Sequence, residues 1–483
     1  MRMLKLWCLT LLAVSVWLMP GTLLSKEIAL PDTPAGRLIE KRLQAFNTGD
    51  AAALQAYKDA HEADLSVERE LALREMTGGF QLLRISHDEP NRLEVILREQ
   101  DGDRVGTLSL QIDPQRPDRV ARVNLIPMSR VPADLMPERL SRDEAWRRVS
   151  NKAAQLAADD RFAGVLATGR DGRVATSMSL GDADRARGAK NTAETRFRIG
   201  SMYKMFTAVA VLQLVEQGRV ELDAPLARYL PDYPNAELAD KVTIRHLLTH
   251  TGGTGDIFTD GYQAQRTAIR EHDDYVRLFG NRAVEFAPGS REAYSNYGFV
   301  LLGAIIERVT GSSFHDVLRE RIFNPAGMHD TGAEPEDQVR AQVSIGYTRT
   351  ESGLVDNRDL LPWRGTAAGG GYTTVGDLLR FADALLTQRL LRSESLSEAT
   401  RSQTPGGLYG FGFQIGGSGD TRHFGHAGGA EGMNGALRIY PASGDVVVAL
   451  SNLDPPAAEM LVEYHGNRMP LGAANKNPEG ATP

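Results

Sequence analysis

Two strand patterns that lie far apart in the chain constrain the fold of its larger part. Strand-like segments lie on both sides of the turn Arg170-Asp171-Gly172, with the apolar residues 164–167 before it and residues 174–180 after it. A second hairpin pattern surrounds Pro441-Ala442-Ser443-Gly444, with residues 435–440 before the turn and the apolar run 446–450 after it. The sequence between the two is mostly of helical spacing. Strands at both ends of a region with helices between them predict one antiparallel sheet built from the two ends, over a domain of residues 142–453.

A smaller unit precedes this domain, over residues 34–130. Its two helical patterns are followed by four alternating segments, and turn signals such as Asp101-Gly102-Asp103 separate them, which indicates a small α+β domain. Residues 45–54 (AFNTGDAAAL) resemble the start of NTF2-like cone domains. That resemblance implies a cone that can hold a ligand; a packing or oligomerisation module is the alternative. Residues 131–141 form a linker, and residues 454–483 form a short helix and a polar tail.

The first 25 residues have the character of a signal peptide. Arg2 and Lys5 precede an apolar run over residues 6–18, and small Ser25 follows the break in that run. We therefore expect a secreted or periplasmic protein, with an uncleaved anchor as the alternative. Cys8 is the one cysteine of the chain, so the mature protein would have no thiol for a disulfide or a metal. The net charge of −7 argues against a nucleic-acid partner, and no membrane contact is expected beyond the signal segment.

The segment Ser201-Met202-Tyr203-Lys204 is the strongest chemical signal. Helical spacing from Met202 onward puts Ser201 at a helix N-terminus and Lys204 one turn away on the same face. Free backbone N–H groups at that position favour developing negative charge. A serine hydroxyl needs a nearby base or cation to act as a nucleophile, and Lys204 supplies one. A helix-capping serine followed by a solvated lysine would give the same pattern.

Two later segments add to this signal. Tyr294-Ser295-Asn296 precedes a helical run, and a tyrosine beside an ammonium group loses its proton more easily. The amide of Asn296 can donate to a substrate carbonyl. His426-Ala427-Gly428-Gly429 precedes the last hairpin, where a free N–H at Gly429 could complete an oxyanion hole. Taken singly, each segment also fits a structural role, as a turn asparagine, a half-buried tyrosine or a glycine bulge.

The order S-x-x-K, Y-x-N and H-x-G resembles the serine β-lactamase and penicillin-binding-protein superfamily, in particular its class C β-lactamase, esterase and D,D-peptidase-like branch. Residues 243–253 and 369–374 are also similar to that branch. The resemblance covers about residues 142–452. It implies an α/β (α+β) fold with an antiparallel sheet flanked by helices, plus a helical subdomain.

The resemblance also implies the roles of the site residues. Ser201 would be the acylated nucleophile, and Lys204 and Tyr294 would share the proton transfers as a coupled pair whose base is left open. The backbone N–H groups of Ser201 and Gly429 would form the oxyanion hole. The substrate side would be lined by Asn296, His426, Gly428 and Gly429.

No cofactor or metal is expected. The pairs His246/His250 and His423/His426 have spacings that a metal could use, but no H-E-x-x-H pattern accompanies them.

These observations predict a serine hydrolase that cleaves an ester or amide through a Ser201 acyl-enzyme, of the esterase or D-amino-acid peptidase type. Its partner would be a small-molecule ester, amide or peptide substrate. Class C β-lactamases have a lysine where this chain has His426, which disfavours a lactamase because neutral histidine does not attract the lactam carboxylate. The alternatives are a β-lactamase or D,D-carboxypeptidase acting on cell-wall peptides, and a non-catalytic binding protein. The sequence does not indicate an oligomeric state.

Overall fold

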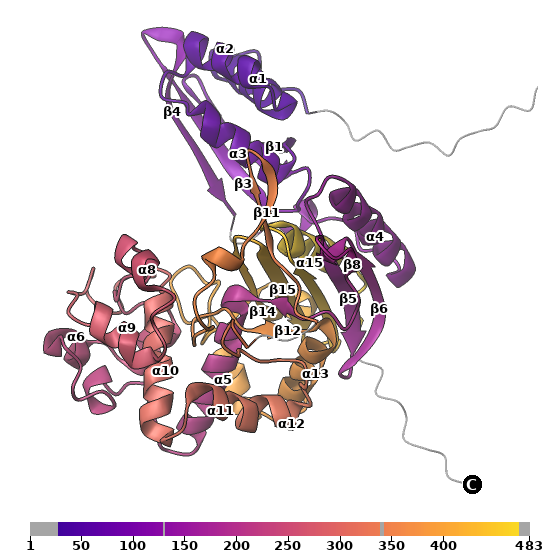
Figure 1. The fold of residues 1–483 in the computed structure, drawn as a ribbon. Coiled ribbons are helices and arrows are strands. Elements are labelled where there is room, and N and C mark those ends of the chain that lie inside the picture. Colours follow the sequence, from indigo (N-terminus) through magenta and orange to yellow (C-terminus); the bar gives the residue numbers. More distant parts are fainter. Residues whose placement is uncertain (1–27, 129–130, 339–341, 473–483) are drawn as a thin grey trace, which may run out of the picture.

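The computed structural model describes residues 28–128, 131–338 and 342–472. The predicted signal peptide at residues 1–25 lies outside them. Figure 1 shows an N-terminal unit above a larger body, in which a sheet domain carries a helical lobe on one side. Among the described segments, no helix has both the length and the apolar character that crossing a membrane requires.

The N-terminal unit packs three helices on a four-stranded antiparallel sheet. Its elements are α1 (Pro34–Thr48), α2 (Ala51–His61), α3 (Val67–Thr77), β1 (Phe80–Glu89), β2 (Arg92–Glu99), β3 (Val105–Asp113) and β4 (Arg116–Pro127), with strand order β1-β2-β3-β4. Side-chain oxygens of Thr33, Asp50 and Ser66 accept backbone N–H groups at the three helix starts. Helices followed by an antiparallel sheet match the order expected for this unit, and its likeness to NTF2 stays a prediction.

Buried charges hold the N-terminal unit on the larger body. Asp103, in the connection between β2 and β3, is buried and accepts hydrogen bonds from both terminal nitrogens of Arg468. Next to it, Asp101 accepts from Arg161 at 2.6 Å. Arg161 and Arg468 belong to the larger body, so the turn predicted at residues 101–103 forms part of the contact between the two units.

The sheet of the large domain joins the two ends of that domain, as predicted. It has six antiparallel strands in the order β13 (Gln414–Gly416), β14 (His423–Ala430), β15 (Met433–Tyr440), β16 (Asp445–Ser451), β5 (Gly164–Arg170) and β6 (Arg173–Leu180). Alternate residues of β16 face opposite sides. Val446, Val448 and Leu450 pack in the core with α5 (Lys204–Glu216) and α13 (Val375–Leu386). Val447 and Ala449 pack toward α4 (Arg142–Ala158) and α15 (Ala457–Arg468).

The domain boundary predicted at residue 453 is wrong, because α15 belongs to the sheet domain. Ala458, Leu461 and Val462 of this helix are buried in the same cluster as α4 and β16. The backbone N–H of Ala458 also donates to the side chain of Asn434 on β15, at 2.7 Å. The helix predicted near the start of the tail is present, but it covers one face of the sheet. The domain therefore extends at least to Met469, which is buried.

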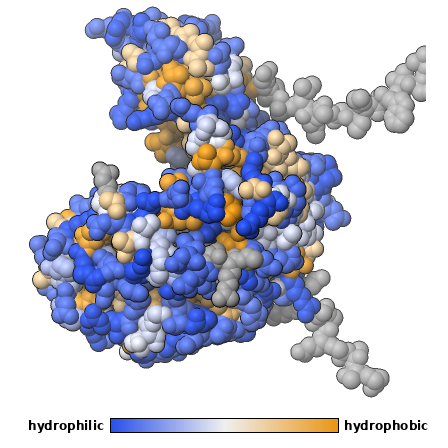
Figure 2. All heavy atoms as spheres, in the orientation of Figure 1, coloured by the Kyte–Doolittle hydropathy of each residue, from blue (hydrophilic) through white to orange (hydrophobic). Residues whose placement is uncertain are grey.

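The helical lobe and short elements complete the body. The lobe contains α6 (Ala236–Lys241), α7 (Ile244–Leu248), α8 (Asp260–Gln265), α9 (His272–Phe279) and α10 (Asn296–Thr310), and α11 (Phe314–Leu318) follows it. The hairpin β10 (Tyr347–Thr350) and β11 (Gly353–Asp356) rises toward the N-terminal unit (Figure 1). Figure 2 shows a hollow between the N-terminal unit and the helical lobe, with apolar surface at several places along its border.

Candidate active site

Ser201 lies on a short turn between a strand and a buried helix. Strand β9 (Phe197–Arg198) is followed by one turn of 3-10 helix (Gly200–Tyr203), and α5 begins at Lys204. Ser201 therefore lies in the turn that leads into the helix, and the α-helix begins two residues later than the start predicted at Met202. The N–H of Ile199 donates to the carbonyl of Gly371 at 2.9 Å, which fixes this turn against the predicted segment 369–374.

Lys204 is fully buried and makes three hydrogen bonds. Its side-chain nitrogen Nζ lies 3.1 Å from Ser201 Oγ, 2.7 Å from Asn296 Oδ1 and 2.6 Å from the carbonyl oxygen of Ala368. Burial lowers the pKa of Lys204 to about 7, although the charge of Asp256 acts in the opposite direction. A substantial fraction of Lys204 is therefore a neutral amine at neutral pH, able to accept a proton from Ser201.

Tyr294 completes the group around the nucleophile. The Lys204 nitrogen lies 4.8 Å from the centre of the Tyr294 ring, and the residue is 45% exposed. Burial of the hydroxyl raises the pKa of Tyr294, and a hydrogen bond with Ser201 offsets this in part. The expectation that the lysine would ease proton loss from the tyrosine is therefore not met. The cost of placing a phenolate away from water is the largest effect, and the negative charge of Asp256 acts in the same direction.

Asn296 contacts Lys204 with one end of its amide and Asp256 with the other. Its Oδ1 accepts from Lys204, and its Nδ2 lies 3.2 Å and 3.0 Å from the two carboxylate oxygens of Asp256. The predicted donation from this amide to a substrate carbonyl does not fit, since its donor side already faces Asp256. Sequence reasoning missed Asp256. The one available signal was its place three residues after the branch-typical segment 243–253.

His426 is buried in β14, and both of its ring nitrogens contact uncharged groups. Its Nε2 lies 3.0 Å from the hydroxyl of Tyr409, and its Nδ1 contacts the carbonyl oxygen of Ala427. Burial, and then the charge of Lys204, lower the pKa of His426 to about 3. The imidazole is therefore neutral at physiological pH, as the sequence suggested. Its partner Tyr409 was not among the predicted residues.

The glycines of the third motif bring β14 against the nucleophile turn. A Cβ atom on Gly428 would lie 2.1 Å from the carbonyl oxygen of Ile199 and 2.8 Å from the backbone nitrogen of Ser201. A Cβ on Gly200 would lie 3.1 Å from the nitrogen of Gly429. The N–H groups predicted for the oxyanion hole, those of Ser201 and Gly429, therefore belong to two backbone segments in direct contact.

The histidines with metal-compatible spacing have structural contacts. His246 Nδ1 accepts the backbone N–H of Thr243 at the start of α7, and buried His250 Nδ1 accepts that of Ser295. His423 Nδ1 lies 3.1 Å from the carbonyl oxygen of Thr421. Within the residues that the structure describes, no group of three or more acidic, histidine or cysteine side chains has the arrangement of a metal site.

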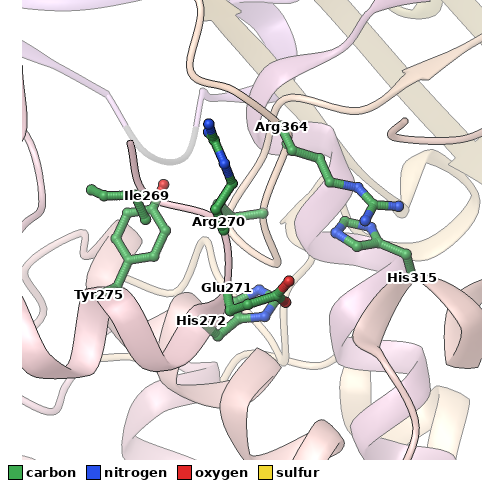
Figure 3. A pocket seen from close by; sticks show the side chains of 9 residues that line it. Ile269, Arg270, Glu271, His272, Tyr275, His315 and Arg364 are labelled. Atoms are coloured by element: carbon green, nitrogen blue, oxygen red, sulfur yellow. The ribbon is translucent and has the colours of Figure 1, made fainter. Parts of the chain in front are cut away.

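A second polar cluster, formed by His272 and Glu307, contacts the segment that binds Lys204. His272 Nε2 accepts the N–H of Ala367 at 3.1 Å, while its Nδ1 lies 3.1 Å from a carboxylate oxygen of Glu307. Ala367 precedes Ala368, which holds Lys204. Figure 3 shows a pocket beside this histidine, with His315 and Arg364 on its far side. Its volume of about 10 Å³ leaves room for one water molecule at most, so it is not a substrate site.

The sequence and the fold of this chain are similar to those of known proteins. The family model described as Beta-lactamase matches residues 149–467. Penicillin-binding protein 4 of Amycolatopsis lactamdurans is 31% identical over 322 residues, which covers 61% of this chain and 83% of that protein. Esterase EstB of Burkholderia gladioli is 31% identical over 301 residues, covering 54% and 76%. The crystal structure of D-amino acid amidase from Ochrobactrum anthropi SV3 complexed with D-phenylalanine matches with a TM-score of 0.58 at 26% identity, covering 67% and 97%.

Proposed function

Because the chain belongs to the beta-lactamase family, we propose that it is a serine hydrolase that cleaves an uncharged ester or amide through an acyl-enzyme on Ser201. The observation that carries the proposal is the buried amine of Lys204, 3.1 Å from the Ser201 hydroxyl. Its relatives include an esterase and a D-amino acid amidase, which cleave such bonds according to their names. A role as a non-catalytic binding protein gives no reason for a lysine held in this environment.

The proton transfers follow from the pKa directions of the two candidate bases. Lys204 has a pKa of about 7 and accepts the Ser201 proton as the hydroxyl oxygen bonds to the substrate carbonyl carbon. The N–H groups of Ser201 and Gly429 stabilise the oxyanion. Tyr294, whose pKa is raised, passes its proton to the leaving alcohol or amine and takes up the proton that Lys204 received from Ser201, so that both residues return to their starting states. Water then attacks the acyl carbon and gives up a proton to Lys204. Lys204 returns that proton to the Ser201 oxygen as the bond to the acyl carbon breaks and the acid leaves.

The charges around the site favour a substrate without a carboxylate. The histidine at the third motif is neutral, so it offers no cation to an anionic group. Asp256 lies next to the site, and Glu431 follows Gly429 by two residues. Large side chains are exposed at Tyr294, at Phe258, which follows Asp256 by two residues, and at Leu408, which precedes Tyr409. A neutral ester or amide with an apolar acyl group fits these surroundings better than a lactam or a peptide carboxylate.

A matched pair of substrates tests this proposal. Each of several p-nitrophenyl or D-amino-acid esters would be compared with the same molecule bearing a free carboxylate next to the scissile bond. We expect kcat/KM to be at least tenfold higher for the member without the carboxylate, and Ser201→Ala to abolish both activities. Faster cleavage of the carboxylate-bearing member, or of a penicillin, would favour the lactamase or D,D-carboxypeptidase alternative.

The location of the protein is a separate proposal. We propose that the N-terminal 25 residues direct export, which places the hydrolase in the periplasm or outside the cell. N-terminal sequencing of the protein recovered from the exported fraction tests this. A first residue near Lys26 is expected, whereas an intact N-terminus in a membrane pellet would indicate an anchor.

A further inference from the structure

The carboxylate of Asp256 contacts the last residue of the Y-x-N segment, Asn296, at both its side chain and its backbone. Both oxygens of Asp256 accept from Nδ2 of Asn296, and one of them is also 3.4 Å from the backbone nitrogen of the same residue. The other end of that amide is 2.7 Å from Lys204. The three side chains therefore form one chain of hydrogen bonds that ends at the nucleophile Ser201, 3.1 Å from the lysine.

We propose that Asp256 is a positioning residue that fixes the Asn296 amide with its oxygen toward Lys204. This inference rests on the proposed hydrolase function. The physical reason is that a carboxylate can only accept hydrogen bonds, so it requires the NH₂ side of the amide. If the amide were flipped, its oxygen would face the carboxylate and its NH₂ would face the lysine, which is itself a donor. Asp256 therefore selects the orientation in which Lys204 has an acceptor.

Asp256 is itself held in place. One oxygen accepts the backbone N–H of Ile257 at 2.6 Å, and the carbonyl group of Asp256 accepts from the guanidinium of Arg282. Thr254, two residues before Asp256, shares a hydrogen bond of 2.9 Å with Ser295, the residue before Asn296. The loop is thus joined to the start of α10 next to the carboxylate, so the amide orientation is set before a substrate arrives.

The carboxylate also has an electrostatic effect on the amine. The titratable side chains that face Lys204 are Asp256, Tyr294, His250 and His426. Burial keeps both histidines and the tyrosine neutral, which leaves the aspartate as the charged group. Its charge raises the pKa of Lys204 against the effect of burial. Removing that charge must therefore lower the pKa of the lysine.

Two variants with opposite expected effects test the proposal. Asp256→Asn keeps one acceptor for the amide but removes the charge, so the acid limb of kcat/KM against pH moves to lower pH by at least 0.5 unit. The double variant Asp256→Asn with Asn296→Asp exchanges the two groups and keeps the hydrogen-bond chain. It places the carboxylate directly on Lys204, so its acid limb moves to higher pH. Asp232→Asn removes a charge that is 88% exposed and leaves the limb in place.

The outcomes separate this proposal from the proposed function. If the parent protein cleaves no ester, the hydrolase proposal fails. If the parent is active and neither variant moves the limb, Asp256 has no positioning role and this inference is overturned. Asp256→Ala serves as the second measurement: we expect kcat to fall at least tenfold with little change in KM, and Asp256→Glu to restore part of it. Equal losses in Asp256→Ala and Asp256→Glu would contradict a positioning role.

Discussion

The side-chain nitrogen of Lys204 lies 3.1 Å from the hydroxyl oxygen of Ser201, in a position without solvent exposure. An ordinary lysine would be charged there and could not accept a proton. Burial changes this, because it lowers the pKa of the amine to about 7. The arrangement that makes the lysine useful to Ser201 also makes it costly to the fold, since a buried ammonium group has lost its hydration.

This cost predicts how stability depends on pH. In the unfolded chain Lys204 titrates at its ordinary value of 10.5, and in the folded protein it titrates at about 7. Between these values the unfolded state binds more protons, so the free energy of unfolding rises with pH. We expect the parent to gain about 2 kcal/mol from pH 7 to pH 9 relative to Lys204→Met, measured by urea unfolding. Equal pH dependence in the two proteins would contradict a depressed pKa.

The hydroxyl of Tyr294 is predicted to matter for rate and little for folding. Tyr294→Phe removes the proton relay next to Ser201, and kcat/KM should fall by about 10²–10⁴. The melting temperature should change by only a few degrees, because the residue is partly exposed. Tyr229→Phe is the control, since that hydroxyl accepts the N–H of Glu221 away from the site. A Tyr294→Phe enzyme as active as this control would leave Lys204 as the sole proton carrier.

Gly428 is predicted to tolerate no side chain. A methyl group there would meet the Ile199 carbonyl at 2.1 Å, so the nucleophile turn and β14 must separate. We expect Gly428→Ala to lower the rate of Ser201 acylation at least 100-fold. Gly261→Ala is the matched control, because its nearest neighbour would be 3.8 Å away and alanine suits the helix α8. An acylation rate within tenfold of the parent would show that β14 and the turn can move apart without loss.

The contact between the two units predicts coupled unfolding. Asp103 is a nearly inaccessible carboxylate, 1% exposed, bound by Arg468. Removing one partner of a buried pair typically costs about 3–5 kcal/mol, so Asp103→Ala should lower stability by this order and separate the unfolding of the N-terminal unit. Asp32→Ala breaks a pair whose carboxylate is 93% exposed and should cost less than about 1 kcal/mol. Calorimetry distinguishes these, and similar curves for both variants would mean that the units fold independently.

The backbone architecture could be predicted where local patterns are strong. The two hairpins at residues 164–180 and 435–450 pair through β5 and β16, as their patterns suggested. The helix at 457–468 was expected, but its place on the sheet was not. Its apolar face is short and lies between polar residues, and only tertiary contacts, those with α4 and β16 and with Asn434, show where it packs.

The site was predicted in its residue types but not in its contacts. Ser201, Lys204, Tyr294 and Asn296 come together as expected. Asp256 could not be found in this way, because a lone aspartate in a glycine-rich loop has the same pattern as an ordinary turn residue. The directions in which the pKa values of the site residues shift could not be predicted from the sequence either. Desolvation depends on what surrounds a side chain in three dimensions, and it is the largest effect at Lys204, Tyr294 and His426.

The central claim is that Lys204 activates Ser201 as a nucleophile. Incubation with a fluorophosphonate probe followed by intact-mass measurement tests it most directly, with the parent, Ser201→Ala and Lys204→Met run side by side. The account predicts a single adduct on the parent, none on Ser201→Ala, and labelling of Lys204→Met slowed at least 100-fold. A folded parent that takes up no probe, or a Ser201→Ala protein labelled as readily as the parent, would contradict it.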